Sequence, residues 1–329
     1  MASARADAVT SDSTISVILP TFRREKLLLD TVRAVARLTE PGDDVLVIDQ
    51  TPEHEAATDE GLGELARSGA IRWFRKQRPS QCEAMNAGAL LAHGAFLLFL
   101  DDDIIPSSTL LSAHRRALVE DPVLPATTGQ VLQPWNPEPV DTVAGFDLRF
   151  DSAYDKPCDV LTLMAGNFAI RREVFLRLGG MDENFAGNNY RNDAELAHRI
   201  HSGTGRLLRF VPEASVRHLL AGGGNRAFGS KDSWGAIGGS VGDYYFALKW
   251  YVWRRAAVHV LRRLVRAPLS RYSVTRPWII PMLVAREWLA LGIAARRLLF
   301  RPGDGVKTLA GYDDLRPALA NPELNAARG

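Results

Sequence analysis

The sequence predicts a doubly wound α/β sheet flanked by helices and followed by an amphipathic helical segment. Apolar strand runs alternate with helical patterns through the first hundred residues, which favours a mostly parallel sheet. The run at 96–100 leads directly into three carboxylates at 101–103, at the strand end where such sheets bind ligands. Beyond residue 230 the composition becomes basic and aromatic, which predicts the helical segment.

The first half of the chain supplies four expected strands and three expected helices. The strands are "ISVILP" at 15–20, "DDVLVID" at 43–49, "IRWFRK" at 71–76 and "AFLLFL" at 95–100, and the helices are at 25–38, 54–68 and 81–94. Continuous apolar runs without a helical period are typical of strands that are buried on both faces of a sheet. The carboxyl ends of these strands should therefore lie together near a buried core.

The second half is less regular. Five prolines between 122 and 139 predict an irregular segment. After it we expect a strand at 161–170, a short helix within 171–185 that a glycine pair closes, a helix at 192–203 and a strand at 206–218 that ends in His218. The predicted organisation is a flexible N-terminus (1–14), a catalytic α/β domain (15–230), a basic aromatic helical segment (231–301) and a C-terminal tail (302–329).

Composition restricts the class of protein. A hydrophobic fraction of 46% excludes general disorder, and two cysteines exclude a disulfide framework or a cysteine-based zinc site. The first residues contain no apolar core of a signal peptide, so export is not expected. No uncharged apolar stretch reaches the roughly 18–20 residues of a spanning helix, so the sequence predicts no bilayer crossing.

The basic segment has a second expected function. Residues 240–301 contain 12 Lys/Arg and two acids, a local charge of 12 − 2 = +10, and they include four of the seven tryptophans. Apolar residues recur at three- and four-residue steps from Phe246 to Leu264, as on one stripe of a helix. This pattern predicts contact with an anionic membrane surface. Helices packed on the catalytic domain with solvated arginines are the alternative, and binding to nucleic acid is not expected.

The three aspartates predict a cation site. In extended chain, Asp101 and Asp103 point to one side and Asp102 to the other. Crowded carboxylates repel one another and need a positive partner. A divalent cation, Mg²⁺ or Mn²⁺, would supply it and would complete its ligand shell with the phosphates of a diphosphate substrate. A solvated acidic turn is the alternative.

Several motifs in series resemble one family. "ISVILPTFRR", "VLVIDQ", "FLDDD", "AGNFAIRREVFLRLGGMDENF", "NDAELAHRI" and "VPEASVRH" stand in an order similar to that of the family 2 nucleotide-sugar glycosyltransferases of the GT-A fold. The resemblance spans about residues 15–218. It departs from the family at Gln50, Met85, Met181 and Asn192, where other residues are usual.

The resemblance implies a role for particular residues. Asp193 would be the catalytic base, and Asp101, Asp103 and His218 would be metal ligands. The residues implied in binding the nucleotide sugar are Pro20, Thr21, Phe22, Arg23, Asp49, Arg78, Asn86, Asp101, Asp102, Gly166, Asn167, Gly180 and Arg226. Two alternatives stay open. Asp193 could be only a first-turn acid beside a capping-box pair of Asn192 and Glu195, and the loop 222–226 could be a linker instead of a lid.

The expected protein is therefore a metal-dependent, inverting glycosyltransferase with a nucleotide-sugar donor and a glycan or lipid-linked acceptor. It would act in polysaccharide or cell-envelope biosynthesis, in the cytoplasm and peripherally on the inner face of the cell membrane. The alternatives are a nucleotidyltransferase, which would want a glycine-rich phosphate loop that "PTFRREK" lacks, and a nucleotide-binding membrane adaptor without turnover.

Overall fold

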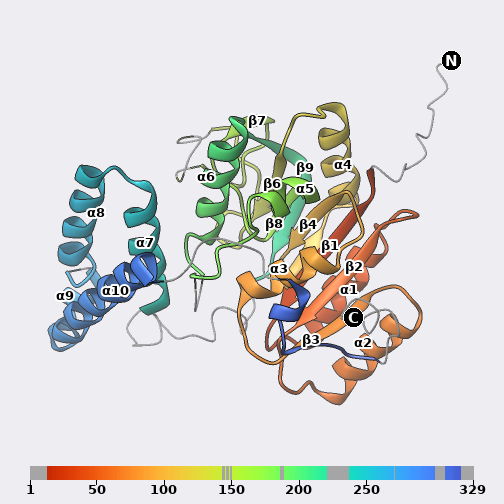
Figure 1. The fold of residues 1–329 in the computed structure, drawn as a ribbon, viewed down its shortest axis with the longest axis horizontal. Helices are drawn as coiled ribbons and strands as arrows, with labels where there is room; N and C mark the ends of the chain where they lie inside the picture. Colours follow the sequence, from red (N-terminus) through yellow and green to blue (C-terminus); the bar gives the residue numbers. More distant parts are fainter. Residues whose placement is uncertain are drawn as a thin grey trace.

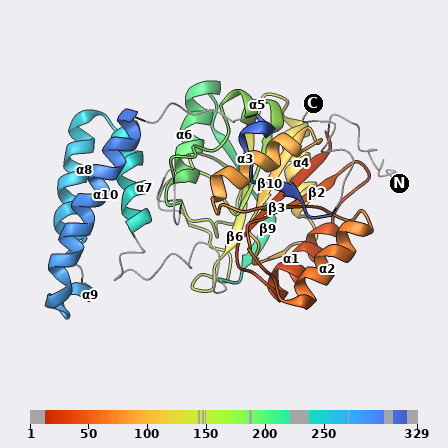
Figure 2. The ribbon, with the colours of Figure 1, turned by 60° about the horizontal axis from the view of Figure 1, so that its bottom comes forward.

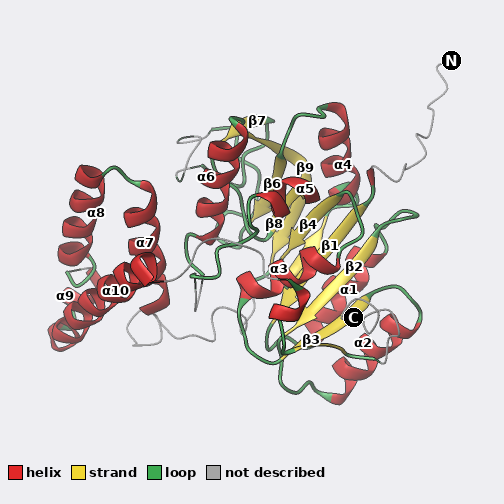
Figure 3. Cartoon of the chain, in the orientation of Figure 1, coloured by secondary structure: helices red, strands yellow, loops and turns green. Residues whose placement is uncertain are grey.

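A computed structural model of the chain describes residues 13–142, 145, 148, 150–185, 189–220, 237–269, 271–300 and 308–319. A central sheet carries helices on both faces, and a group of C-terminal helices lies beside this sheet domain (Figures 1 and 3). The α/β class predicted from the sequence, a sheet flanked by helices, is confirmed. The expected boundary near residue 230 and nearly all of the expected flexible N-terminus lie outside the described residues.

The sheet is mixed and not mostly parallel as predicted: one half is parallel, and the other half combines antiparallel pairs with the parallel pair β6–β9. Its strands are β1 Ile15–Thr21, β2 Asp44–Asp49, β3 Arg72–Lys76, β4 Phe96–Leu100, β5 Ile104–Pro106, β6 Ala126–Leu132, β7 Cys158–Val160, β8 Asn167–Arg171, β9 Leu208–His218 and β10 Leu315–Pro317. The order is β10-β3-β2-β1-β4-β8-β6-β9-β5, with β7 paired to β9. Strands β3, β2, β1 and β4 are parallel as predicted, whereas β8 is antiparallel to both of its neighbours.

Strand alternation divides the interior into two cores. In β1, Val17 and Leu19 pack with apolar residues of α1, α2 and α4, while Ile18 faces the opposite core with α3, α5 and α6. These helices are α1 Lys26–Ala36, α2 Ala56–Arg67, α3 Gln81–Leu91, α4 Leu110–Glu120, α5 Arg172–Arg177 and α6 Asn192–Thr204. Because β1, β2 and β4 are buried on both faces, their polar residues are confined to the strand ends.

Five strands differ from the prediction, and two of them, β5 and β7, are three-residue strands where no strand was expected. β6 lies in the stretch that was expected to be irregular, and its residues are all buried although Thr127 to Gln130 interrupt the apolar run. β8 begins only at Asn167, because residues 164–166 form a turn beside Asp101. β10 comes from the stretch expected to be a tail, follows the short 3-10 helix η5 (Leu309–Gly311), and pairs with β3. A three-residue strand carries too little pattern to be recognised in sequence.

The C-terminal helices form a bundle beside α6 (Figure 2). They are α7 Ile237–Trp250, α8 Trp253–Arg266, α9 Arg271–Val274 and α10 Ile280–Phe300, with the 3-10 helix η4 (Pro277–Ile279) before α10. The single stripe predicted from Phe246 to Leu264 is wrong, because the chain turns at Tyr251 and Val252. Val252 is extended, with φ −55° and ψ 145°, and this changes the phase of the helical pattern.

The bundle buries charge and exposes apolar side chains. Asp243 and Glu287 are buried, and Arg263 turns inward to pair with both. Trp253 and Leu261 on α8 face outward, with 74% and 62% of their surface exposed. The sequence placed the basic and apolar residues of this helix on separate sides. That separation is incomplete because the buried carboxylates attract basic residues from α8 into the bundle.

The segment Pro277–Phe300 is long and apolar enough to cross a membrane by length and composition alone, with 28% of its apolar window buried. The sequence predicted no crossing because no uncharged apolar stretch is long enough, and Arg286 and Glu287 interrupt this segment at its centre. Both residues are buried in the bundle, 7% and 0% exposed. Trp288 and Leu289 project outward instead, so the outer face of α10 is more apolar than the sequence indicates.

Candidate active site

An acidic cluster lies where β4 ends. Asp101, Asp103 and His218, the last residue of β9, have ligand atoms within 4.8 Å of one another. His218 Nε2 lies 2.9 Å from Asp103 Oδ1 and 3.7 Å from Asp101 Oδ2. The other ring nitrogen, Nδ1, is 2.9 Å from Gln133 Oε1, an arrangement that leaves Nε2 available as a ligand. Two carboxylates and one imidazole fit a divalent cation.

Asp102 points away from this cluster, as strand alternation predicts. Its Oδ2 accepts a hydrogen bond from Thr21 Oγ1 at 2.7 Å, and its Oδ1 accepts one from Arg24 Nε at 3.0 Å. Arg24 Nη2 also donates to Asp103 Oδ2 at 2.8 Å. The buried Arg24 guanidinium therefore fixes two of the three aspartates and offsets part of their mutual repulsion.

The electrostatics suit the binding of a cation. Burial raises the pKa of Asp101 to about 6, and repulsion from Asp103 and Asp102 adds to the rise while His218 and Arg24 oppose it. A cation placed among these groups would lower that pKa again, because it removes the cost of holding several negative charges together.

Gly166 supports the cluster from the turn that precedes β8. Its carbonyl oxygen accepts a hydrogen bond from the Asp101 backbone N–H at 3.2 Å. A Cβ at position 166 would lie 2.1 Å from Asp101 Oδ2, so a larger residue cannot occupy this position while the carboxylate keeps its place.

We expect Gly166→Ala to weaken Mn²⁺ binding by about tenfold or more while the fold is kept, because a flexible carboxylate moves aside more easily than backbone. Isothermal titration with Mn²⁺ measures this effect. The control is Gly292→Ala, which meets nothing within 4 Å on α10 and should raise helix stability slightly. Equal Mn²⁺ affinity in both variants would contradict the contact.

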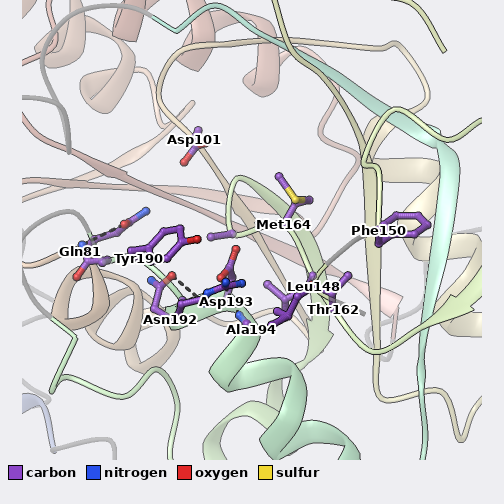
Figure 4. A pocket seen from close by; sticks show the side chains of 14 residues that line it. Gln81, Asp101, Leu148, Phe150, Thr162, Met164, Tyr190, Asn192, Asp193 and Ala194 are labelled. Carbon is purple, nitrogen blue, oxygen red and sulfur yellow. Dashed lines mark hydrogen bonds between the residues drawn. The ribbon is translucent and has the colours of Figure 1, made fainter. Parts of the chain in front are cut away.

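A pocket of about 310 Å³ adjoins the acidic cluster. Asp101 and Asp193 both line it, Asp193 from the first turn of α6 (Figure 4). Tyr190 and Arg191 line it beside them, and Arg191 adopts a left-handed conformation with φ 75°. The structure thus places the predicted base and one predicted metal ligand on the same cavity.

The Asp193 carboxylate is oriented by its own helix. Asp193 Oδ1 accepts a hydrogen bond from the Ala194 backbone N–H at 2.7 Å. Burial raises the pKa of Asp193, although that hydrogen bond and the nearby Arg191 act against the rise. A carboxyl group with a raised pKa is a stronger base once it is ionised.

The capping-box alternative for this helix is not formed. Arg191 is the residue before the first turn and makes no side-chain cap. Asn192 Oδ1 accepts from the Asp193 N–H, and Glu195 binds Arg199 Nε at 2.8 Å and Lys249 Nζ at 2.9 Å. α7 brings Lys249 against the buried face of α6, and Glu195 pairs there with Lys249 and Arg199 instead of completing a cap.

The predicted nucleobase position is occupied by a buried network at the end of β2. Asp49 Oδ2 lies 2.8 Å from His54 Nε2 and 3.2 Å from Trp73 Nε1, and Glu25 lies 3.2 Å from His54 Nδ1. Burial alone would lower the pKa of His54, but Asp49 and Glu25 outweigh it and raise the pKa. Asp49 itself is fully buried, so its contact with a nucleobase stays a prediction.

Four other predicted residues take part in protein contacts. The Asn86 amide bonds to the Met181 backbone and to Glu183, and the Asn167 amide donates to the carbonyls of Gln130 and Ala214. Arg78 pairs with Asp313 and Asp314, and Gly180 closes α5 with φ 68°. For these residues the structure gives a structural reason, and their role in binding the donor stays a prediction.

The remaining predicted residues lie near the end of β1 or outside the described chain. Pro20 is in β1, and the Arg23 guanidinium lies 5.1 Å from the Phe22 ring, on the exposed surface next to Thr21. Arg226 and the rest of the loop at 222–226 lie outside the described residues. Sequence reasoning missed Arg24 and His54. The need to neutralise three aspartates could have pointed to Arg24, but nothing in the local pattern singles out His54.

The sheet topology, the acidic cluster and the adjoining pocket together define a glycosyltransferase of the GT-A fold. Residues 16–179 match the family described as Glycosyl transferase family 2. The chain belongs to the family 2 glycosyltransferases.

Similar proteins agree with this assignment. Glucosyl-dolichyl phosphate glucuronosyltransferase of Haloferax volcanii is 23% identical over 220 residues, which are 63% of this chain and 69% of that protein. An uncharacterized glycosyltransferase of Rickettsia conorii is 29% identical over 107 residues, 31% of this chain and 17% of that protein.

Solved structures share the fold. The mannosyltransferase PcManGT of Pyrobaculum calidifontis, in complex with GDP-Man and Mn²⁺, superposes with a TM-score of 0.52 and 16% identity over 88% of each chain. GalNAc-T7 with UDP, GalNAc and Mn²⁺ superposes with a TM-score of 0.51 and 21% identity. That match covers 62% of this chain and 43% of GalNAc-T7, so this chain corresponds to less than half of the GalNAc-T7 chain.

Proposed function

We propose that the protein is a metal-dependent, inverting glycosyltransferase. It moves a sugar from a nucleoside-diphosphate donor to a hydroxyl of a glycan or lipid-linked acceptor. The observation that carries this proposal is the shared pocket, which Asp193 lines from α6 and Asp101 lines from the end of β4. A base and a diphosphate-binding cluster on one cavity are what a direct displacement at an anomeric carbon requires.

In this mechanism Asp101, Asp103 and His218 Nε2 would hold Mn²⁺ or Mg²⁺. The bound cation supplies positive charge that stabilises the diphosphate leaving group. Asp193 accepts the proton of the acceptor hydroxyl while that oxygen attacks the anomeric carbon from the side opposite the diphosphate, which inverts the configuration. Arg24 keeps Asp102 and Asp103 in place throughout, so the cluster is preorganised before the donor binds.

We also propose that the protein acts at the cytoplasmic face of the cell membrane, in envelope or polysaccharide biosynthesis. The support is the outer face of the bundle, where Trp253, Trp278 and Trp288 are 74%, 73% and 60% exposed beside the +10 excess of residues 240–301. The family match favours an enzyme over a nucleotide-binding adaptor without turnover. It also favours transfer of a sugar over synthesis of a nucleotide sugar by a nucleotidyltransferase.

The experiment combines thermal unfolding with product analysis. GDP and UDP should raise the unfolding temperature only when Mn²⁺ or Mg²⁺ is present, and the matching nucleotide sugar should then release nucleoside diphosphate. Release of pyrophosphate from a nucleoside triphosphate would instead identify a nucleotidyltransferase. An adaptor would be identified if nucleotide stabilises the protein but no tested combination of nucleotide sugar with lipid or glycan acceptor gives turnover.

A further inference from the structure

A second pocket lies on the helical bundle, apart from the cavity that holds Asp193. Its volume is about 390 Å³, within the range of small-ligand sites. It is lined by Asp243, His259, Arg262, Arg263, Arg266 and Ala267, so α8 supplies nearly all of it. Four basic side chains and one acid therefore surround one cavity.

The floor of this pocket is balanced in charge. Asp243 Oδ2 lies 2.8 Å from His259 Nε2 and 3.0 Å from Arg263 Nη1, and Asp243 Oδ1 lies 3.1 Å from Arg191 Nε. Arg263 Nε also pairs with Glu287 at 3.1 Å. Burial would raise the pKa of Asp243, but Arg263, His259 and Arg191 outweigh it and lower the pKa. The floor is thus an ion network in which each carboxylate has a basic partner.

The mouth of the pocket is not balanced. Arg262 and Arg266 are exposed and form no ion pair within the part of the chain that the structure describes. They stand four residues apart on α8, so one turn of helix places both guanidinium groups at the same opening. Two guanidinium groups beside a cavity are the arrangement that proteins use to bind a phosphate group, because each can donate two parallel hydrogen bonds.

The surroundings of the mouth are apolar. Leu261, Val265 and Leu269 occupy the adjacent row of α8 and its C-terminal extension, and they are 62%, 59% and 56% exposed. An apolar row beside an arginine row matches the boundary between acyl chains and headgroups in a bilayer. A soluble anion would gain nothing from this row, whereas a lipid would use both rows at once.

We propose that this pocket binds the phosphate group of a membrane lipid, held between Arg262 and Arg266 with its chain along Leu261 and Val265. Binding of the lipid phosphate does not depend on the proposed glycosyltransferase function; only its role in supplying the acceptor rests on that function. Arg191 lines the catalytic pocket and pairs with Asp243 in the floor of this one, so a single ion pair connects the two pockets. The phosphate could belong to a lipid-linked acceptor or to a phospholipid that anchors the enzyme.

The experiment is flotation of the full-length protein with vesicles of a neutral phospholipid. Each set of vesicles contains one added anionic lipid, a prenyl phosphate, phosphatidylglycerol or a fatty acid, in amounts that give equal negative charge. Arg262→Gln/Arg266→Gln is compared with Arg254→Gln/Arg255→Gln, which removes the same charge from the same helix outside the pocket. At 0.5 M salt, where general attraction extends only about 4 Å, we expect the pocket variant to lose about tenfold or more in affinity for a phosphate lipid. The control variant should change by less than about threefold.

Each outcome decides the proposal. A larger loss for the prenyl phosphate identifies the acceptor, and a larger loss for phosphatidylglycerol identifies an anchor. Equal losses of affinity in the two variants would show general electrostatic attraction and overturn the site. Binding of the unsubstituted protein to fatty-acid vesicles as tightly as to phosphate-lipid vesicles would overturn it as well. Unfolding temperatures of both variants with nucleotide and Mn²⁺ confirm the fold. Because flotation needs no turnover, failure of the proposed function would leave its result unaffected.

Discussion

Asp193→Asn should lower the turnover number by about 10²-fold or more while the affinity for the donor nucleotide stays nearly the same. The substitution keeps the shape of the side chain, and its oxygen can still accept from the Ala194 N–H. Only the ability to take a proton is lost. The measurement is kcat with a saturating acceptor, beside the affinity for nucleoside diphosphate with Mn²⁺.

The pH profile gives an independent check of the same residue. Because the pKa of Asp193 is raised, the base loses its charge at a higher pH than an ordinary carboxyl group. Activity should be present above that pKa and fall as the pH decreases through it, with Mn²⁺ and donor saturating. The control is Asp30→Asn on the exposed face of α1. Unchanged turnover in Asp193→Asn would reduce Asp193 to a charge at a helix end.

Asp103→Ala should lower the transfer rate by about 10³-fold or more. It should also abolish the additional nucleotide binding that Mn²⁺ gives the unsubstituted protein. The variant should fold, since Arg24 keeps its bond to Asp102 and one of three crowded carboxylates is gone. Thermal unfolding with nucleoside diphosphate, with and without Mn²⁺, measures the effect.

The matched control for this change is Asp59→Ala, which removes a carboxylate from the surface of α2 that pairs only with Arg75 among the described contacts. The control should keep the full Mn²⁺-dependent stabilisation. Normal turnover of Asp103→Ala in the presence of a chelator would exclude a metal mechanism at this cluster.

The parallel half of the sheet could be predicted because all of its central strands must meet the same physical requirement. Strands buried on both faces must be apolar throughout, and the runs that end at Leu19, Ile48 and Leu100 meet that requirement. The polar residues that follow them could be placed at one edge for the same reason. The strand β6 could not be found in this way, because Thr127 and Thr128 are buried with hydrogen-bond partners that only the folded chain supplies.

The acidic residues of the site could be predicted from the sequence, but some of its basic residues could not. Asp101 and Asp103 stand two positions apart in one run of three aspartates, and His218 ends a motif that resembles the family. Arg24 approaches the aspartates only after β1 and β4 pair, about eighty residues apart in the chain. The phase of α8 depends on Asp243 and Glu287, which lie in two other helices, so no local pattern could show that Arg263 turns inward.

The position of β10 changes how the helical bundle should be regarded. Leu315 to Pro317 return to pair with the outer strand β3, and Asp314 binds Lys76 Nζ at 3.2 Å and the Arg78 N–H at 2.8 Å. The bundle is therefore an insertion between two parts of the catalytic domain and not an appendage to it. Cutting the chain before α7 would leave the edge of β3 unpaired, a known route to edge-to-edge aggregation. A bundle-free enzyme should instead join residue 220 to residue 308 through a flexible linker, so that the last strand still closes the sheet.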